Sequence, residues 1–178
     1  LASSAASDVY KRQQLLLQMR HMVKTGMLGT INMVDLKYTH GYGCDPTGDV
    51  KSEGQKWRVD SSKVGKAFVL GDLSTHTFYE SQLATNDMKL KQVLCDRQAF
   101  VGSRYPLEDN AYVLMRYENG AVGRMWCSCV DAGTPETQVI RIVGSKASVE
   151  WHDAQPNHLL YQEQGKPAQL MILSLIHI

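Results

Sequence analysis

The stretch AYVLMRYENGAVGRMWCSCV, residues 111–130, contains two strand-like segments joined by one turn signal. Apolar and aromatic residues dominate both segments and alternate with the period of two that is typical of β-strands. Asn119-Gly120 between them predicts a tight hairpin in which both residues have a positive φ, because a type I′ turn requires it. The stretch therefore predicts two adjacent antiparallel strands.

The same pattern continues on both sides of this hairpin. Strands are predicted over residues 90–100, 111–118, 121–130, 137–143, 147–151 and 159–163. Gly144-Ser-Lys predicts another turn. Consecutive strands with short connections must run antiparallel, because a parallel return needs a crossover of a dozen or more residues.

The first half of the chain supplies the helices. Apolar residues at 15, 16, 19, 22 and 23 predict a helix over residues 14–25 that Gly26 ends. A strand over 30–40, a long glycine-rich loop over 41–56 and a helix over 72–84 follow. Two helices and about seven strands predict an α+β fold, an open, mainly antiparallel β-sheet with helices on one face.

The two ends of the chain are unlike the rest. SSAASDVYKRQ, Ser3 to Gln13, and LSLIHI, Leu173 to Ile178, read like translations of the two strands of a transposase adapter used for sequencing libraries. We therefore expect residues 1–13 and 173–178 to be non-native tails, and residues 14–172 to be one domain cut from a longer protein. The alternative is a polar, disordered N-terminus and a final apolar strand.

Composition excludes several classes of protein. Nineteen Lys and Arg against eighteen Asp and Glu give a net charge of +1 without a basic cluster, so we expect no nucleic-acid partner. The chain contains no stretch of about 18 apolar residues, so no membrane span is predicted. We expect a cytoplasmic protein unless an upstream segment carries an export signal. The four cysteines form no C-x-x-C pair, so we interpret them as reduced core or half-buried residues, with Cys127 and Cys129 on one face of a strand.

The segment GDLSTH, residues 71–76, holds the strongest candidate for chemistry. Asp72 and His76 are four residues apart and so lie on one side of a helix, one turn from each other. On spacing alone, a structural interpretation is favoured, in which Asp72 caps the helix and His76 packs in its first turn. A metal site would need further ligands, and Gly41-Tyr-Gly43 lacks the third glycine of a dinucleotide-binding turn.

Four motifs, in a fixed order along the chain, favour a chemical role for Asp72 and His76 over a structural one. They are GQKWRVD (54–60), VLGDLSTH (69–76), PLEDNAYVLMRYENGAVG (106–123) and IRIVGSKASVEWHDAQPNHL (140–159). This set resembles the C-terminal domain of the glucose-fructose oxidoreductase/inositol dehydrogenase family. The resemblance implies an N-terminal Rossmann domain that is missing here, an active site between the two domains, and NAD or NADP bound mainly by the missing domain.

The resemblance also assigns roles to residues. Asp72 and His76 match the D-x-G-x-H motif of the family as catalytic residues, and the family's catalytic lysine lies upstream of this chain. Trp57, Arg58 and Asp60 match a W-R-x-D segment near the substrate pocket. Ser74 replaces the motif's glycine, where its hydroxyl would narrow the pocket or bind a substrate hydroxyl.

These assignments predict an oxidoreductase that acts on a CH–OH group of a sugar, inositol or similar polyol, with His76 as general base. No metal ligand set and no cofactor-binding residue are predicted within this chain. Two alternatives stay open: an NAD-assisted glycosidase of the same architecture, and a non-catalytic sheet module. Large side chains on both faces of residues 111–118, with Tyr112 and Leu114 on one face, predict a homo-oligomer that forms through the open sheet face.

Overall fold

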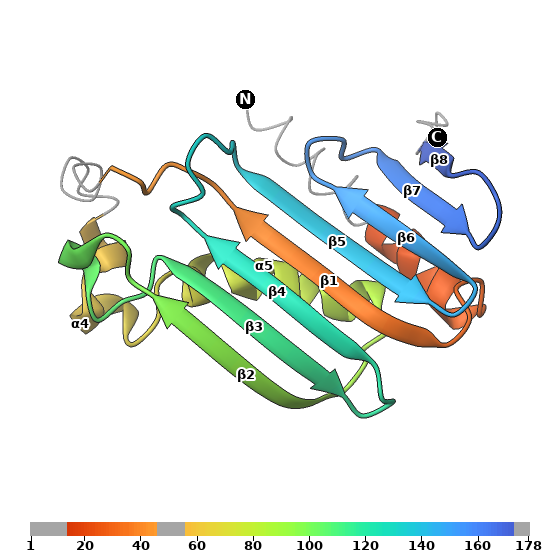
Figure 1. Ribbon diagram of the computed structural model, residues 1–178, viewed down its shortest axis with the longest axis horizontal. Coiled ribbons are helices and arrows are strands. Elements are labelled where there is room, and N and C mark those ends of the chain that lie inside the picture. The colour runs from red at the N-terminus through yellow and green to blue at the C-terminus, as the bar shows by residue number, and fades with distance from the viewer. Residues whose placement is uncertain (1–13, 46–55, 173–178) are drawn as a thin grey trace.

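The computed structural model describes residues 14–45 and 56–172, which form one eight-stranded sheet with helices on one face (Figure 1). The strands are β1 (Ile31–Thr39), β2 (Leu90–Gln98), β3 (Asn110–Tyr117), β4 (Val122–Ser128), β5 (Thr137–Gly144), β6 (Ala147–His152), β7 (His158–Glu163) and β8 (Gln169–Ile172). The helical elements are a helix over residues 14–24, η1 (Trp57–Val59), α4 (Ser61–Val64), α5 (Val69–Ala84) and η2 (Gly102–Arg104). The predicted fold class is confirmed, whereas the two predicted tails and most of the predicted loop lie outside the described residues.

The first strand lies in the middle of the sheet. The strand order is β2-β3-β4-β1-β5-β6-β7-β8, and only the pairing of β1 with β4 is parallel. Between β1 and β2 the chain is long enough to include α5, so it can cross behind the sheet to the β2 edge. Two antiparallel runs, β2-β3-β4 and β5-β6-β7-β8, then fill the sheet on either side of β1.

The turn between β3 and β4 differs from the predicted one. Gly120 has a φ of 88°, but Asn119 does not have a positive φ, so the prediction of a type I′ turn is wrong. Gly120 N donates to Tyr117 O over 3.1 Å, and Tyr117 N donates to Ala121 O over 3.0 Å. This is a three-residue loop with glycine in the left-handed position. The side chain of Asn119 stabilises it by accepting from Ala121 N.

Two further elements, β8 and α5, also differ from the prediction. The strand β8 was not predicted, because three of its four residues are exposed and it shows no apolar alternation. Helix α5 begins at Val69, three residues before the predicted start. The acid Asp72 is therefore already inside the helix.

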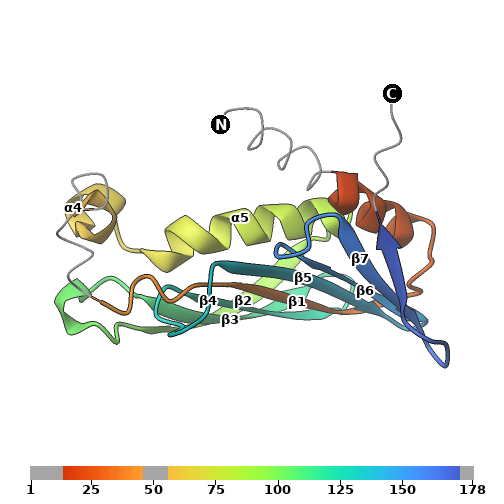
Figure 2. The same cartoon turned by 90° about the horizontal axis from the view of Figure 1, so that it is seen from above.

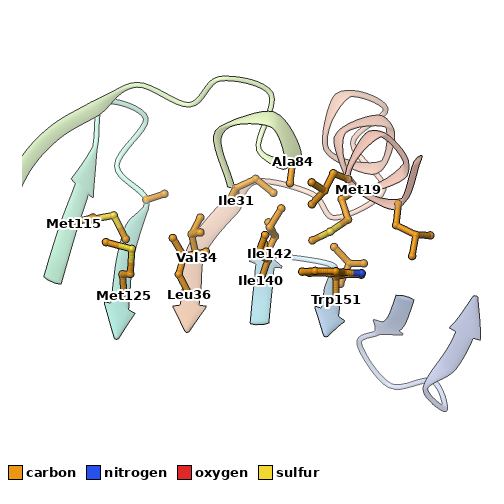
Figure 3. Close-up of a cluster of buried hydrophobic side chains, with 14 of the residues drawn as sticks. Met19, Ile31, Val34, Leu36, Ala84, Met115, Met125, Ile140, Ile142 and Trp151 are labelled. Atoms are coloured by element: carbon orange, nitrogen blue, oxygen red, sulfur yellow. The ribbon is translucent and has the colours of Figure 1, made fainter. Parts of the chain in front are cut away.

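One layer of helices covers one face of the sheet, and the opposite face is open (Figure 2). The helix over residues 14–24 packs at the β6 end, where Met19 and Trp151 are both fully buried (Figure 3). Helix α5 contacts β1, β4 and β5, and its Val69 belongs to the same buried core as Val34 and Ile140 of the sheet.

The cysteine prediction is half correct. Cys127 and Cys129 are buried two residues apart, and burial raises the pKa of Cys127 to about 12. Cys44 and Cys95 are free thiols as predicted but are exposed rather than buried. Among the described helices, none has the length and apolar character needed to cross a membrane.

Candidate active site

A cavity of about 300 Å³ lies where the first turns of α5 meet the end of β1. It is lined by side chains from β1 and the residues after it, from η1, from α5 and from the segment that follows β4. These are Tyr38, His40, Tyr42, Gly43, Arg58, Val59, Phe68, Val69, Asp72, Leu73, His76, Cys129 and Glu136. The predicted pair, Asp72 and His76, is therefore brought to one cavity.

The helical period explains why α5 presents this pair. Val69, Leu73, Thr77 and Ser81 are buried at intervals of four residues and face the sheet. Because successive residues of an α-helix are about 100° apart, Asp72 and His76, each one position before a buried residue, lie along one border of this buried row. Both side chains therefore emerge at the edge of the helix layer, over the cavity.

A buried amide of the sheet holds this turn of α5 against β5. Gln138 of β5 is 1% exposed, and its Nε2 donates to Thr77 Oγ1 over 3.0 Å and to Glu80 Oε2 over 2.5 Å. Thr77 directly follows His76 in the sequence. The sheet thus holds the backbone that carries His76 by a polar contact as well as by packing.

The start of α5 is capped by Glu108 and not by Asp72. Oε1 of Glu108 accepts from Phe68 N over 2.9 Å and from Leu70 N over 3.0 Å, and its other oxygen lies 2.7 Å from Arg97. Phe68 is the N-cap residue and makes no side-chain capping bond. The capping alternative for Asp72 is therefore wrong, because the helix already has a carboxylate at its amino end.

Arg58 is the partner of Asp72. Its Nε lies 3.3 Å from Asp72 Oδ2, and its guanidinium lies 5.2 Å from the centre of the Trp57 ring. A second cavity of about 190 Å³ is bounded by these three side chains and by the residues at the start of α5. The structure therefore places Trp57 and Arg58, two of the four predicted substrate-binding residues, beside the predicted catalytic acid.

The other two predicted substrate-binding residues are placed elsewhere. Asp60 is the N-cap of α4, where it accepts from Ser62 N over 3.0 Å, and it lines neither cavity. Ser74 is 8% exposed and donates its hydroxyl to the carbonyl of Leu70. It lies two residues after Asp72, about 200° around the helix, so it occupies the opposite border of the buried row.

The His76 side chain is exposed to the cavity and to solvent. Its ring makes no hydrogen bond with another residue in the described part of the chain. In particular, Asp72 is paired with Arg58 and not with this imidazole. As far as residues 14–45 and 56–172 are concerned, both ring nitrogens of His76 are available to a ligand.

A second histidine, His40, is a cavity residue that sequence reasoning missed. Its ring stacks on Tyr42 at 5.0 Å, and its Nδ1 accepts from Tyr42 N over 3.3 Å. Burial lowers the pKa of His40 from its usual value, against the opposing effects of Glu136 and Asp72. The bond to Nδ1 places the proton of the neutral ring on Nε2.

Tyr38 and Glu136 were missed as well, and Tyr38 donates its hydroxyl to a Glu136 oxygen. The sequence did contain a pattern that indicates the orientation of Tyr38 and His40. Tyr38 and His40 continue the apolar alternation of Val34 and Leu36, so two polar rings follow on the face that points toward the helices. Nothing in the sequence indicates Glu136, which comes from a distant turn.

This arrangement defines a class of protein. An acid paired with an arginine, two imidazoles, a tyrosine and a glutamate line one polar cavity, in a domain built on an open sheet. The chain belongs to the oxidoreductase family, as the C-terminal alpha/beta domain, whose family model matches residues 20–171.

Individual relatives agree with this assignment. The chain is 56% identical over 169 residues to an uncharacterized oxidoreductase, YfiI, of Bacillus subtilis (strain 168), a match that covers 95% of this chain and 43% of that protein. An inositol dehydrogenase homolog from Azotobacter vinelandii, solved with NAD+, superposes with a TM-score of 0.88 at 45% identity, covering 92% of this chain and 42% of that one. The same homolog solved with NADH and myo-inositol gives a TM-score of 0.83. The chain thus spans less than half the length of these relatives.

Proposed function

We propose that this chain is the substrate-binding and catalytic part of an NAD(P)-dependent oxidoreductase that acts on a CH–OH group of a sugar, inositol or similar polyol. The observation that carries the proposal is the shared cavity of Asp72 and His76, in which the His76 ring has no hydrogen bond to any described residue. A histidine kept only for packing would be buried or bonded. The solved relative with myo-inositol supports a polyol as the substrate class.

The cofactor is proposed to bind mainly outside this chain. A dinucleotide needs backbone N–H groups at a helix N-terminus for its phosphates. In the described residues, the amino end of α5 does not fit, because the Glu108 carboxylate already accepts from Phe68 N and Leu70 N. The hydride chemistry belongs to the cofactor, and this chain contributes position and proton transfer.

His76 is proposed as the general base. Oxidation of a carbinol requires its hydroxyl proton to leave, and an imidazole is a side chain suited to accept a proton near neutral pH. Asp72, held by Arg58, is placed one turn away to accept a hydrogen bond from a neighbouring substrate hydroxyl. Arg58 and Trp57 are proposed to bind the substrate from the η1 side.

His40 has a complementary task in this proposal. Its lowered pKa favours the neutral ring, and its Nδ1 accepts from Tyr42 N, so Nε2–H is a donor without a partner among the described residues. A ring in this state donates to a substrate oxygen, whereas His76 accepts a proton. The two imidazoles would then bind opposite ends of one hydroxyl-bearing fragment.

The proposal is tested in the full-length protein with NAD+ or NADP+ and a panel of polyols and pyranoses. We expect stoichiometric NADH or NADPH formation on at least one of them. Cleavage of a glycoside without net reduction of the cofactor would instead favour the NAD-assisted glycosidase. Failure of the whole panel, with the protein folded, would contradict a polyol oxidoreductase.

We also propose that the chain is a homo-oligomer that associates through the open face of the sheet. The aromatic rings of Tyr112 and Trp126 stack there at 5.8 Å, and Leu114 of the same face is 55% exposed. Apolar side chains of this size gathered on one uncovered face are typical of an interaction surface.

A further inference from the structure

The second cavity, of about 190 Å³, adjoins the cavity that His76 lines. The two cavities share the side chains of Arg58, Phe68 and Asp72, so they meet at the Arg58–Asp72 pair. A pocket that binds a separate drug-sized ligand usually measures about 300–1,000 Å³. Because the second cavity is smaller than this, it suits one part of a ligand whose other part lies in the first cavity.

The walls of the second cavity are mostly apolar, unlike those of the first. They are formed by Trp57, Val64, Ala67, Phe68 and Gly71, with Arg58 and Asp72 at the boundary. The two imidazoles, His40 and His76, line only the first cavity. The second cavity can therefore hold a group that stays chemically unchanged, while the first cavity takes the CH–OH group that reacts.

Gly71, in the first turn of α5, leaves this cavity open. A Cβ atom at this position would meet no packed neighbour within 4 Å among the described residues, so packing does not require glycine. Its φ is not in the left-handed region, so the backbone does not require glycine either. Within a helix, glycine is less stable than alanine by about 0.5–1 kcal/mol. A ligand group beside Gly71 accounts for the missing side chain.

The boundary between the two cavities contains an unused hydrogen-bond donor. Arg58 Nε is buried and makes no hydrogen bond with any described residue, although it lies 3.3 Å from Asp72 Oδ2. Buried donors in folded proteins nearly always have a partner. An oxygen that can only accept, such as the ether oxygen that links two rings, fits this N–H group.

We propose that the second cavity is a subsite for a glycosyl ring, joined through its glycosidic oxygen to the polyol ring in the first cavity. The apolar walls contact the C–H face of the glycosyl ring, and Arg58 Nε donates to the bridging oxygen. The preferred substrate is then a glycoside or disaccharide and not a free polyol. The C–H hydride of the polyol ring goes to NAD(P)+, its hydroxyl proton goes to His76, and the glycosidic bond stays intact. This inference rests on the proposed function and names its substrate class.

The test uses the full-length protein and ligands that differ by one glycosyl ring. The sets are myo-inositol with its galactosyl derivative galactinol, and glucose with maltose, cellobiose and isomaltose. Affinity is measured by calorimetry with the reduced cofactor present, so that no turnover occurs, and kcat/KM is measured by reduction of NAD(P)+.

Three variants separate the subsite from the rest of the helix. Gly71→Leu fills the second cavity, and Gly71→Ala fills less of it while raising the helix propensity of α5. Thr75→Leu is the control, because Thr75 is an exposed residue of α5 that lines neither cavity. Circular dichroism checks the folding of each variant.

We expect at least one two-ring ligand to exceed its one-ring parent by ~10-fold or more in affinity and in kcat/KM, which is the range that filling an apolar pocket provides. Gly71→Leu should reduce this ratio to about one, Gly71→Ala should reduce it in part, and Thr75→Leu should leave it unchanged. If Gly71→Leu does not fold, the fall of the ratio in Gly71→Ala relative to Thr75→Leu decides the result.

Two outcomes would overturn the subsite while the proposed function stands. One is a wild-type protein that favours no two-ring ligand, or a preference that survives in both Gly71 variants. The other is a Gly71→Leu variant whose only change is weaker binding of NAD(P)+, because the cavity would then belong to the cofactor. A protein that oxidises none of these ligands would contradict the proposed function, whereas the calorimetric affinities would still decide whether a second ring is bound.

Discussion

Arg58 Nε lies 3.3 Å from Asp72 Oδ2, so the acid one turn before His76 is paired with a cation from η1 and not with the histidine. The pair is more than a third exposed on both sides. An exposed ion pair of this kind contributes only about 0–1 kcal/mol to stability. Because Arg58 and Asp72 line both cavities, we propose that the pair matters more for substrate binding than for stability.

Replacing Asp72 by Asn should separate these two effects. The change keeps the shape of the side chain but removes the charge that accepts from a substrate hydroxyl. In the full-length protein we expect kcat/KM to fall by ~10-fold or more and the melting temperature to change little. Steady-state kinetics and thermal melts on the same preparation check this, and activity that falls only in step with stability would contradict it.

Removing the Glu108 carboxylate should destabilise the fold. Glu108→Ala leaves the N–H groups of Phe68 and Leu70 without their acceptor and removes the buried partner of Arg97. We expect the free energy of unfolding to drop by about 2–4 kcal/mol. Glu118→Ala, an exposed acid in the β3–β4 turn, is the matched control and should change it by less than about 0.5 kcal/mol. Equal effects in urea denaturation would refute the capping role.

The lowered pKa of His40 predicts a pH dependence of stability. Because the unfolded chain takes up this proton at a higher pH than the folded protein, the free energy of unfolding decreases as the pH falls from about 6.5 to the folded pKa. His40→Asn keeps an acceptor for Tyr42 N and has no proton to bind. Between pH 7.5 and pH 5.5, at roughly one pH unit on either side of the free histidine pKa, the melting temperature of the variant should therefore fall less than that of the wild type.

The cysteines should divide into two reactivity classes. Cys44 and Cys95 are exposed, whereas Cys127 and Cys129 are buried and the pKa of Cys127 is raised to about 12. A chromogenic disulfide reagent at pH 8, a value chosen as near the pKa of about 8.5 of a free thiol, should label two thiols quickly in the native protein and all four after denaturation. Rapid labelling of Cys127 in the native state, located by peptide mass spectrometry, would contradict the packing of β4 against the helix layer.

Local patterns predicted most of the elements because alternation and helical spacing depend only on neighbouring residues. Residues 137–143 were predicted as a strand and are found as Thr137–Gly144. The parallel insertion of β1 beside β4 was not predicted, because which strands pair across a long connection depends on tertiary packing. The start of α5 was missed for a related reason, since its cap is supplied by Glu108, 40 residues away from Phe68.

The site was predicted only in part. The spacing of Asp72 and His76 placed them on one helix border, and the motif resemblance added Trp57 and Arg58, which the structure brings to the same place. Ser74 was assigned by its position in a motif, but the helical rotation turns it to the opposite border. His40 and Glu136 come from other elements, so only the folded chain reveals them as neighbours.

The central claim is that His76 accepts a proton from the substrate. The most direct measurement compares kcat and melting temperature for His76→Ala and for His21→Ala, an exposed histidine of the 14–24 helix that lies outside both cavities. In the full-length protein we predict that His76→Ala lowers kcat by ~10²-fold or more at an unchanged melting temperature, and that His21→Ala changes neither. Near-normal turnover in His76→Ala, or a loss that matches that of His21→Ala, would contradict the account.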